Sequence, residues 1–89
     1  MSGYWKQVKR DAGPLSGMLS NRLAVLRLVF GVENGPVRMG PDSVPILRCM
    51  AVASEWERHG ADAKPEDSVY SELAELAERH GEIEVWGDW

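Results

Sequence analysis

Three stretches of the chain place apolar residues at the spacing of an α-helix, and a glycine follows each stretch. The stretches cover about residues 15–30, 43–59 and 65–80, and the glycines are Gly31, Gly60 and Gly81. Glycine readily adopts the left-handed backbone conformation that ends many helices, so the periodicity and the stop signals agree. The sequence therefore predicts an all-α fold, a bundle of three main helices in a single small helical domain over residues 1–89.

The tetrapeptide Glu-Arg-His-Gly ends the second and the third stretch, and its two copies contain both histidines, His59 and His80. Arginine and histidine in the last turn of a helix complement the helix dipole and donate hydrogen bonds to unpaired carbonyl groups. A metal site needs three or four converging ligands, and neither copy has a second His or Cys one turn away. We therefore interpret both copies as helix ends, and we predict no metal, cofactor or catalytic site.

The distribution of apolar residues in the first two helices also predicts which side chains are buried. Apolar residues are so frequent between Leu23 and Phe30 that little of the first helix can face water, so we expect it to be the most buried element. In the second helix Trp56 lies on the apolar stripe and is expected in the core. Cys49 is the only cysteine and lies on the same stripe, so we expect a buried, unreactive thiol.

Shorter elements are predicted at both ends of the chain. Tyr4, Trp5, Val8 and Ala12 share one face of a short helix whose other face is basic. Near the other end, polar and apolar residues alternate, which indicates a short strand-like tail. Because a lone strand leaves its backbone unpaired, it needs a partner. The alternative fold is therefore α+β, with a small sheet from residues 32–39 and 82–86.

The charge of the chain is divided unevenly. Residues 1–48 carry seven Lys or Arg against three acids, whereas residues 49–89 carry three against eleven, for a net charge of −4. Such asymmetry indicates charged partners, or two halves that neutralise each other by packing together. The chain opens without a basic-then-apolar leader, and no apolar run approaches the roughly 20 residues that span a bilayer. We expect a cytoplasmic protein without a membrane partner.

The leading functional hypothesis is a non-enzymatic protein–protein interaction protein. Nucleophile–base pairs, phosphate-binding glycine loops and metal-ligand clusters are all missing from the sequence. Tryptophan is over-represented among interface hot spots, which are worth about 2 kcal/mol or more each. We therefore predict that two tryptophans anchor a partner while four glutamates set its charge preference. The predicted partner-binding residues are Trp86, Trp89, Glu72, Glu75, Glu82 and Glu84.

The charge preference suggests the kind of partner. A rigid display of carboxylates can occupy the basic groove of a nucleic-acid-binding protein in place of phosphates. Small acidic inhibitors or regulators of this type, such as phage-borne inhibitors that bind a host protein, are chains of similar size and composition. A homodimer also fits an 89-residue chain, because a core this small gives modest stability.

Two alternatives belong to other functional classes. The first is a small nucleic-acid-binding regulatory domain that uses the basic N-terminal segment, with Trp5, Lys6, Lys9 and Arg10 as its contacts. Three cations make a small footprint, and a helix-turn-helix would turn the acidic helix 65–80 toward a polyanion, so the sequence disfavours this alternative. The second is a self-assembling structural subunit.

Overall fold

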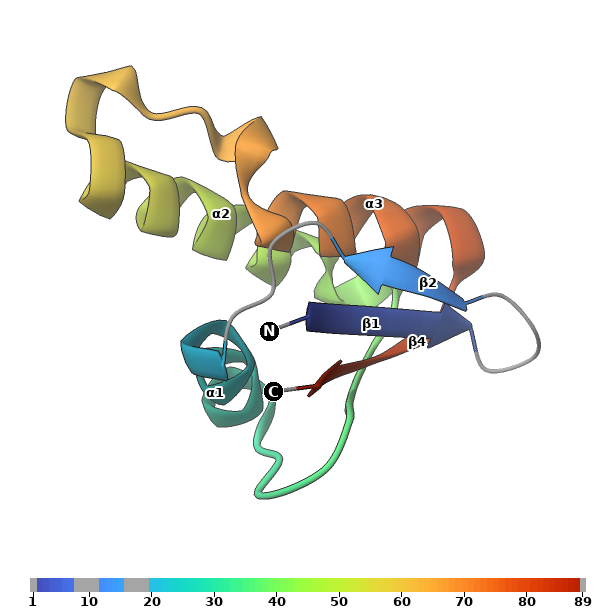
Figure 1. Cartoon of the computed structure of the whole chain (residues 1–89). Helices are drawn as coiled ribbons and strands as arrows, with labels where there is room; N and C mark the ends of the chain where they lie inside the picture. The colour runs from blue at the N-terminus through green and yellow to red at the C-terminus, as the bar shows by residue number, and fades with distance from the viewer. Residues whose placement is uncertain (1, 8–11, 16–19, 89) are drawn as a thin grey trace.

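The computed structural model describes residues 2–7, 12–15 and 20–88, and over these residues the chain folds into three α-helices and a four-stranded sheet (Figure 1). The helices are α1 (Ser20–Phe30), α2 (Val44–His59) and α3 (Val69–His80). The strands are β1 (Ser2–Gln7), β2 (Ala12–Leu15), β3 (Val37–Met39) and β4 (Ile83–Asp88). Short 3-10 turns at Pro41–Ser43, Gly60–Asp62 and Pro65–Asp67 precede α2 and join α2 to α3.

The sheet has the strand order β2-β1-β4-β3, and each neighbouring pair is antiparallel. β4 is an inner strand: Val85 lies opposite Trp5 of β1 on one side and opposite Val37 of β3 on the other. Successive side chains of a strand point to opposite faces. Ile83 and Val85 are fully buried, so they point into the core, and the residue between them points away from it.

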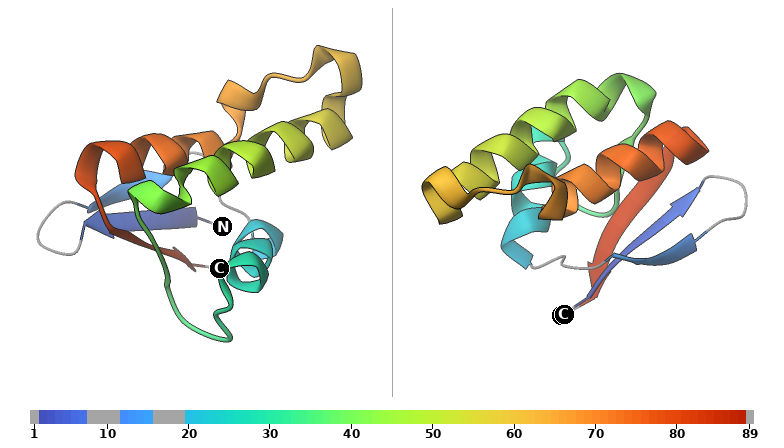
Figure 2. Two further views of the ribbon diagram at one scale, coloured as in Figure 1. Left: turned by 180° about the vertical axis from the view of Figure 1, so that it is seen from behind. Right: turned by 90° about the horizontal axis from the view of Figure 1, so that it is seen from above.

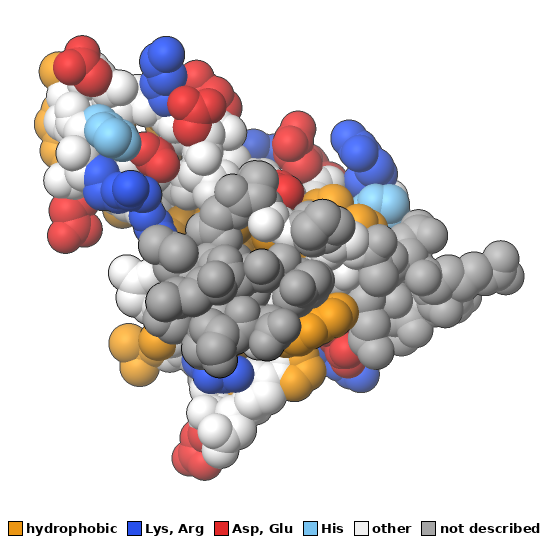
Figure 3. Space-filling view, in the orientation of Figure 1, with side chains coloured by type: hydrophobic (Ala, Val, Ile, Leu, Met, Phe, Trp, Pro, Cys, Tyr) orange, Lys and Arg blue, Asp and Glu red, His pale blue; other side chains and the backbone are white. Residues whose placement is uncertain are grey.

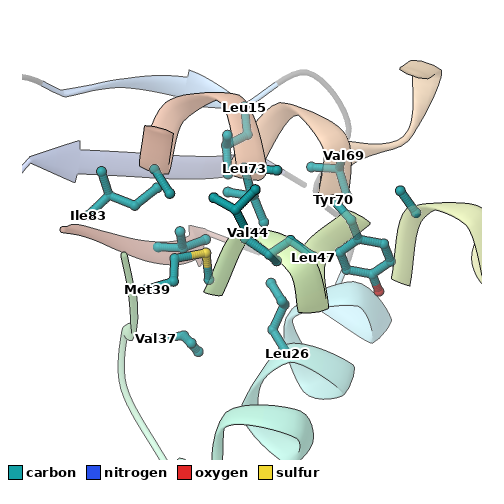
Figure 4. Packing of buried hydrophobic residues seen from close by; sticks show 14 of the residues in the cluster. Leu15, Leu26, Val37, Met39, Val44, Leu47, Val69, Tyr70, Leu73 and Ile83 are labelled. Carbon is teal, nitrogen blue, oxygen red and sulfur yellow. The ribbon is translucent and has the colours of Figure 1, made fainter. Parts of the chain in front are cut away.

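The helices build the rest of the core. α2 and α3 lie side by side over the sheet, and α1 lies beneath α2 when the molecule is viewed from above (Figure 2, right). α1 also contacts β3 and β4. Leu26 of α1, Leu47 of α2 and Leu73 of α3 are fully buried and pack with Val37 and Ile83 of the sheet (Figure 4). All three helices therefore contribute to one hydrophobic core.

The three predicted helices are confirmed, with changes at their first residues. The helix predicted over 15–30 begins at Ser20, and Leu15 belongs to β2. The helix predicted over 43–59 is α2, and the one predicted over 65–80 begins at Val69 after a 3-10 turn. The predicted strand-like tail is β4, and it pairs with the 32–39 segment through β3. The α+β alternative therefore describes the chain better than the helical bundle.

The predicted basic N-terminal helix is wrong, because Ser2–Gln7 forms β1 and Ala12–Leu15 forms β2. A helix of a few turns has little stability of its own in water. β1 instead pairs with β4 along its whole length, from Ser2 opposite Asp88 to Gln7 opposite Ile83. Pairing with a distant strand has overridden a local helical pattern, as tertiary context often does. Residues 8–11 of the predicted helix lie outside the described residues.

The interpretation of both Glu-Arg-His-Gly copies as helix ends is confirmed. Gly60 has a φ of 57° and Gly81 a φ of 80°, conformations that favour glycine over other residues. The amide of Gly60 donates a hydrogen bond to the Trp56 carbonyl, and the amide of Gly81 donates one to the Ala77 carbonyl. These bonds satisfy carbonyl groups in the last turns of α2 and α3.

Candidate interaction surface

The most unusual feature of the surface is that α2 is apolar on two sides. One side is buried in the core and carries Val44, Leu47, Ala51 and Glu55. The opposite side carries Ile46, Cys49, Val52, Ala53 and Trp56, all of which are exposed. Trp56 is 63% exposed, Val52 54% and Ile46 47%. A helix that is apolar all round is ordinarily covered all round, and the described part of this chain covers only one side of α2.

α1 extends this apolar surface on one side of α2. Val25 and Val29 of α1 are 43% and 46% exposed, and with Met50 and Ala53 of α2 they line a groove of about 410 Å³. A second hollow of about 450 Å³ adjoins the groove at Ala53 and is nearly all apolar. We call this surface the α1–α2 face and define it by Val25, Val29, Ile46, Cys49, Met50, Val52, Ala53 and Trp56. Contiguous exposed apolar surfaces of this kind mark interaction sites in soluble proteins.

Charged side chains stand at the edge of the α1–α2 face. A guanidinium nitrogen of Arg22 donates a hydrogen bond to Ser54 Oγ, and the Arg22 guanidinium lies 5.6 Å from the centre of the Tyr70 ring. Arg48 forms an ion pair with Glu78 of α3 at 2.8 Å. Glu57 and Arg58 are exposed beside the groove and make no ion pair within the described residues. Both signs of charge gather around the end of α2 (upper left in Figure 3).

Each histidine has a partner near its own helix end. His59 Nε2 lies 3.4 Å from a carboxylate oxygen of Glu55, which is 5% exposed. His80 stacks on Trp5 of β1, with ring centres 4.7 Å apart and planes inclined by 29°. Within the described residues there is no group of three or more His, Cys, Asp or Glu that could hold a metal ion. The two histidines therefore lie in separate places and serve different contacts.

The predicted C-terminal contact is divided between two sides of the sheet. Glu84 and Trp86 of β4 alternate with the buried Ile83 and Val85, and Trp86 is half-buried. Arg38 of β3 binds Glu84 at 3.0 Å and Glu82 at 3.4 Å, so a neighbouring strand already partners these carboxylates. Glu72 and Glu75 lie on α3, across the opposite face of the sheet, and Trp89 lies outside the described residues. Partner binding by this set stays a prediction.

Two of the four predicted nucleic-acid contacts, Trp5 and Lys6, are neighbours in β1. Trp5 is half-buried, packs against the core and stacks on His80, so much of its ring is already in contact with the protein. Lys6 lies in β1, where the strand register places it opposite Glu84. Lys9 and Arg10 lie outside the described residues. Nucleic-acid binding by this segment also stays a prediction.

Three expectations about burial are wrong, and all three concern α1 and α2. Trp56 is 63% exposed instead of lying in the core, and the Cys49 thiol is exposed instead of buried. α1 was expected to be the most buried element, yet Leu28 is 82% exposed. Apolar periodicity detects a helix but cannot tell which of two apolar sides the chain's own core will cover. The signal that was missed is the number of apolar residues around α2, which exceeds what one core can cover.

No helix in the described part of the chain is long and apolar enough to cross a membrane. Neither a protein-family model, nor a curated protein, nor a solved structure significantly matches this chain.

Proposed function

We propose that this chain is a non-enzymatic protein-interaction protein, a small regulator or assembly subunit, and that its contact surface is the α1–α2 face. The observation that carries the proposal is the exposure of Ile46, Val52 and Trp56 on one side of a helix whose other side is already in the core. Covering apolar area gains roughly 25 cal/mol per Å². A partner that covers this face therefore removes its apolar area from water, and this burial stabilises the complex.

The arrangement of side chains resembles the anatomy of a protein interface. Trp56 is the largest apolar residue of the face and has Val52 and Cys49 beside it in the same hollow, which suits an interface hot spot. Arg48 and Arg58 stand at the rim, where charges set the orientation and the choice of partner more than the affinity.

The spacing of the exposed residues indicates that the partner contributes a helix. Ile46, Cys49, Ala53 and Trp56 follow the spacing i, i+3, i+7 and i+10, which is the seam of a coiled coil. The two middle residues, Cys49 and Ala53, are small and permit close approach of another helix. The proposed activity is therefore helix-on-helix binding through the α1–α2 face.

The test is photo-crosslinking in cells that naturally encode the chain. Benzoylphenylalanine, a photoreactive aromatic residue, replaces Trp56 in one variant and Leu28 in the control variant. Leu28 is more exposed than Trp56 but lies on a different side of α1, in a hollow with Ala24 and Val32. We expect one discrete protein adduct from position 56 that position 28 does not give. The absence of any protein adduct from position 56 would overturn the proposal.

A further inference from the structure

We infer that the protein that covers the α1–α2 face is a second copy of this chain, with α2 of one copy packed against α2 of the other about a two-fold axis. This inference rests on the function proposed above and names the partner. In such a dimer the same surface contacts itself, so the surface must be complementary to itself in shape and in charge.

The shape condition is met by the order of side-chain sizes along the seam. Ile46, Cys49, Ala53 and Trp56 run large, small, small, large, and the order is the same in either direction. When two antiparallel copies of α2 meet, Cys49 lies level with Ala53 of the second copy, and Ile46 lies level with its Trp56. Small side chains therefore meet in the middle, where the helix axes approach most closely, and large side chains close both ends.

The groove beside α2 adds to this fit. α2 presents a ridge formed by Val52 and Trp56, and the groove between α1 and α2 runs next to it, with Val25 and Val29 on its α1 side. In the antiparallel pair the groove side of one copy faces the groove side of the other, so Val25 and Val29 of both copies lie beside the seam. The groove therefore widens the apolar contact beyond α2.

The charge condition is met because the groove is bordered by both signs of charge, with Glu57 on one hand and Arg22 and Arg58 on the other. Glu57 and Arg58 border the groove and make no ion pair within the described residues. A strongly acidic partner is repelled by Glu57, and a strongly basic one is repelled by Arg58 and Arg22. A second copy carries both signs, and in the antiparallel pair Glu57 and Arg58 lie level with Pro45 and Val44 of the other copy, so the like charges of the two copies do not meet. Arg48 adds no unpaired charge, because Glu78 already binds it.

The size of the face suits a weak dimer. α2 has 16 residues and is about 24 Å long at 1.5 Å per residue, and a helix is about 10 Å wide. Its outer side therefore projects to about 240 Å², and the exposed Val25 and Val29 of α1 add to this area. Stable interfaces bury about 800 Å² per partner, so we expect a dimer that dissociates at micromolar concentrations or above.

The first experiment is sedimentation equilibrium on the purified chain from micromolar to sub-millimolar concentration. We expect a dimer whose dissociation constant rises at least about 100-fold for Trp56→Glu and for Val52→Glu, because a carboxylate would be buried within the covered α1–α2 face. Leu28→Glu adds the same charge at an exposed apolar residue outside the face and is expected to leave the dimer unchanged. Circular dichroism on each variant establishes that it is folded. A monomeric wild-type chain, or equal weakening by Leu28→Glu, would overturn the inference.

Disulfide trapping tests the same contact without adding a charge. In the antiparallel pair, Ala53→Cys places a thiol level with Cys49 of the second copy, so mild oxidation is expected to give covalent dimers. Ala24→Cys is the matched control, since Ala24 is exposed on α1 in the hollow that contains Leu28. If both variants form covalent dimers at the same rate, the proposed contact is wrong.

The two proposals fail in different ways. A photo-adduct from position 56 with twice the mass of the chain supports the dimer. An adduct with another protein, from a chain that sediments as a monomer, overturns the dimer and leaves the proposed function standing.

Discussion

α2 and α3 lie side by side over the same sheet, yet they differ in what their outer sides present. α3 buries Leu73 and Ala77 and turns acidic residues outward, among them Glu75 and Glu78. α2 buries Leu47 and turns Val52 and Trp56 outward. The apolar side of α3 is therefore covered within its own domain, whereas α2 has a second apolar side that stays exposed. An apolar stripe thus identifies a contact without showing which molecule supplies the other side of it.

The largest effect is expected on the inner sides of the two helices, which should contribute equally to the core. Leu47 and Leu73 are each 0% exposed, so we expect Leu47→Ala and Leu73→Ala each to lower the free energy of unfolding by about 2–5 kcal/mol. Leu28→Ala, at a site 82% exposed, is the control and is expected to change it by less than about 0.5 kcal/mol. Urea denaturation measures all three. If Leu47→Ala behaved like the control, α2 would not share the core with α3.

A second prediction concerns how α3 is held at its end. Trp5 stacks on His80, the last residue of α3, and a Cβ added to Gly13 would lie 3.1 Å from Trp5 Nε1. We expect Gly13→Val to push the Trp5 ring from this position and to lower the free energy of unfolding by about 1–3 kcal/mol. The higher strand propensity of valine offsets a part of this loss. Gly40→Ala is the control, because its new Cβ would meet its nearest neighbour, an oxygen of Asp42, at 3.6 Å. Thermal unfolding with tryptophan fluorescence is the measurement, and equal melting temperatures for the two variants would contradict the expectation.

The smallest effect is expected where the two helices are joined on their outer side. Arg48 of α2 and Glu78 of α3 are 2.8 Å apart, with side chains 51% and 56% exposed. Exposed ion pairs contribute about 0.2–1 kcal/mol, and salt screens them. A double-mutant cycle with Arg48→Ala and Glu78→Ala is expected to give a coupling energy in this range that shrinks in high salt. A coupling that salt left unchanged would mean that the two side chains interact by packing.

The parts of the fold that could be predicted are those with local signals. Helix periodicity, the glycine stops and the alternating tail all lie within a few residues of the element that they specify, and each is found in the structure. β1 could not be predicted because its partner is β4, about 80 residues away in sequence, and the short helical pattern around Trp5 gave no sign of it.

The candidate surface was missed for a related reason. Trp56 and Cys49 were identified as members of an apolar stripe, and that stripe exists. The same helix has a second apolar stripe, formed by Val44, Leu47 and Ala51. This second stripe is the one that packs into the core. The choice depends on the position of α2 relative to the sheet, and the residues of α2 alone do not contain that information.

The strand order β2-β1-β4-β3 has a consequence for the time course of folding. β1 and β4 are neighbours in the sheet although they come from opposite ends of the sequence, with Ser2 opposite Asp88. The entropy cost of closing a loop rises with its length, and folding slows as the sequence separation of contacts grows. During synthesis β1 leaves the ribosome before β4 does, so β1 has no partner on its other edge until residues 83–88 have emerged. We therefore expect the sheet to close last, and the newly made chain to be most prone to aggregation through that open edge until β4 becomes available to pair.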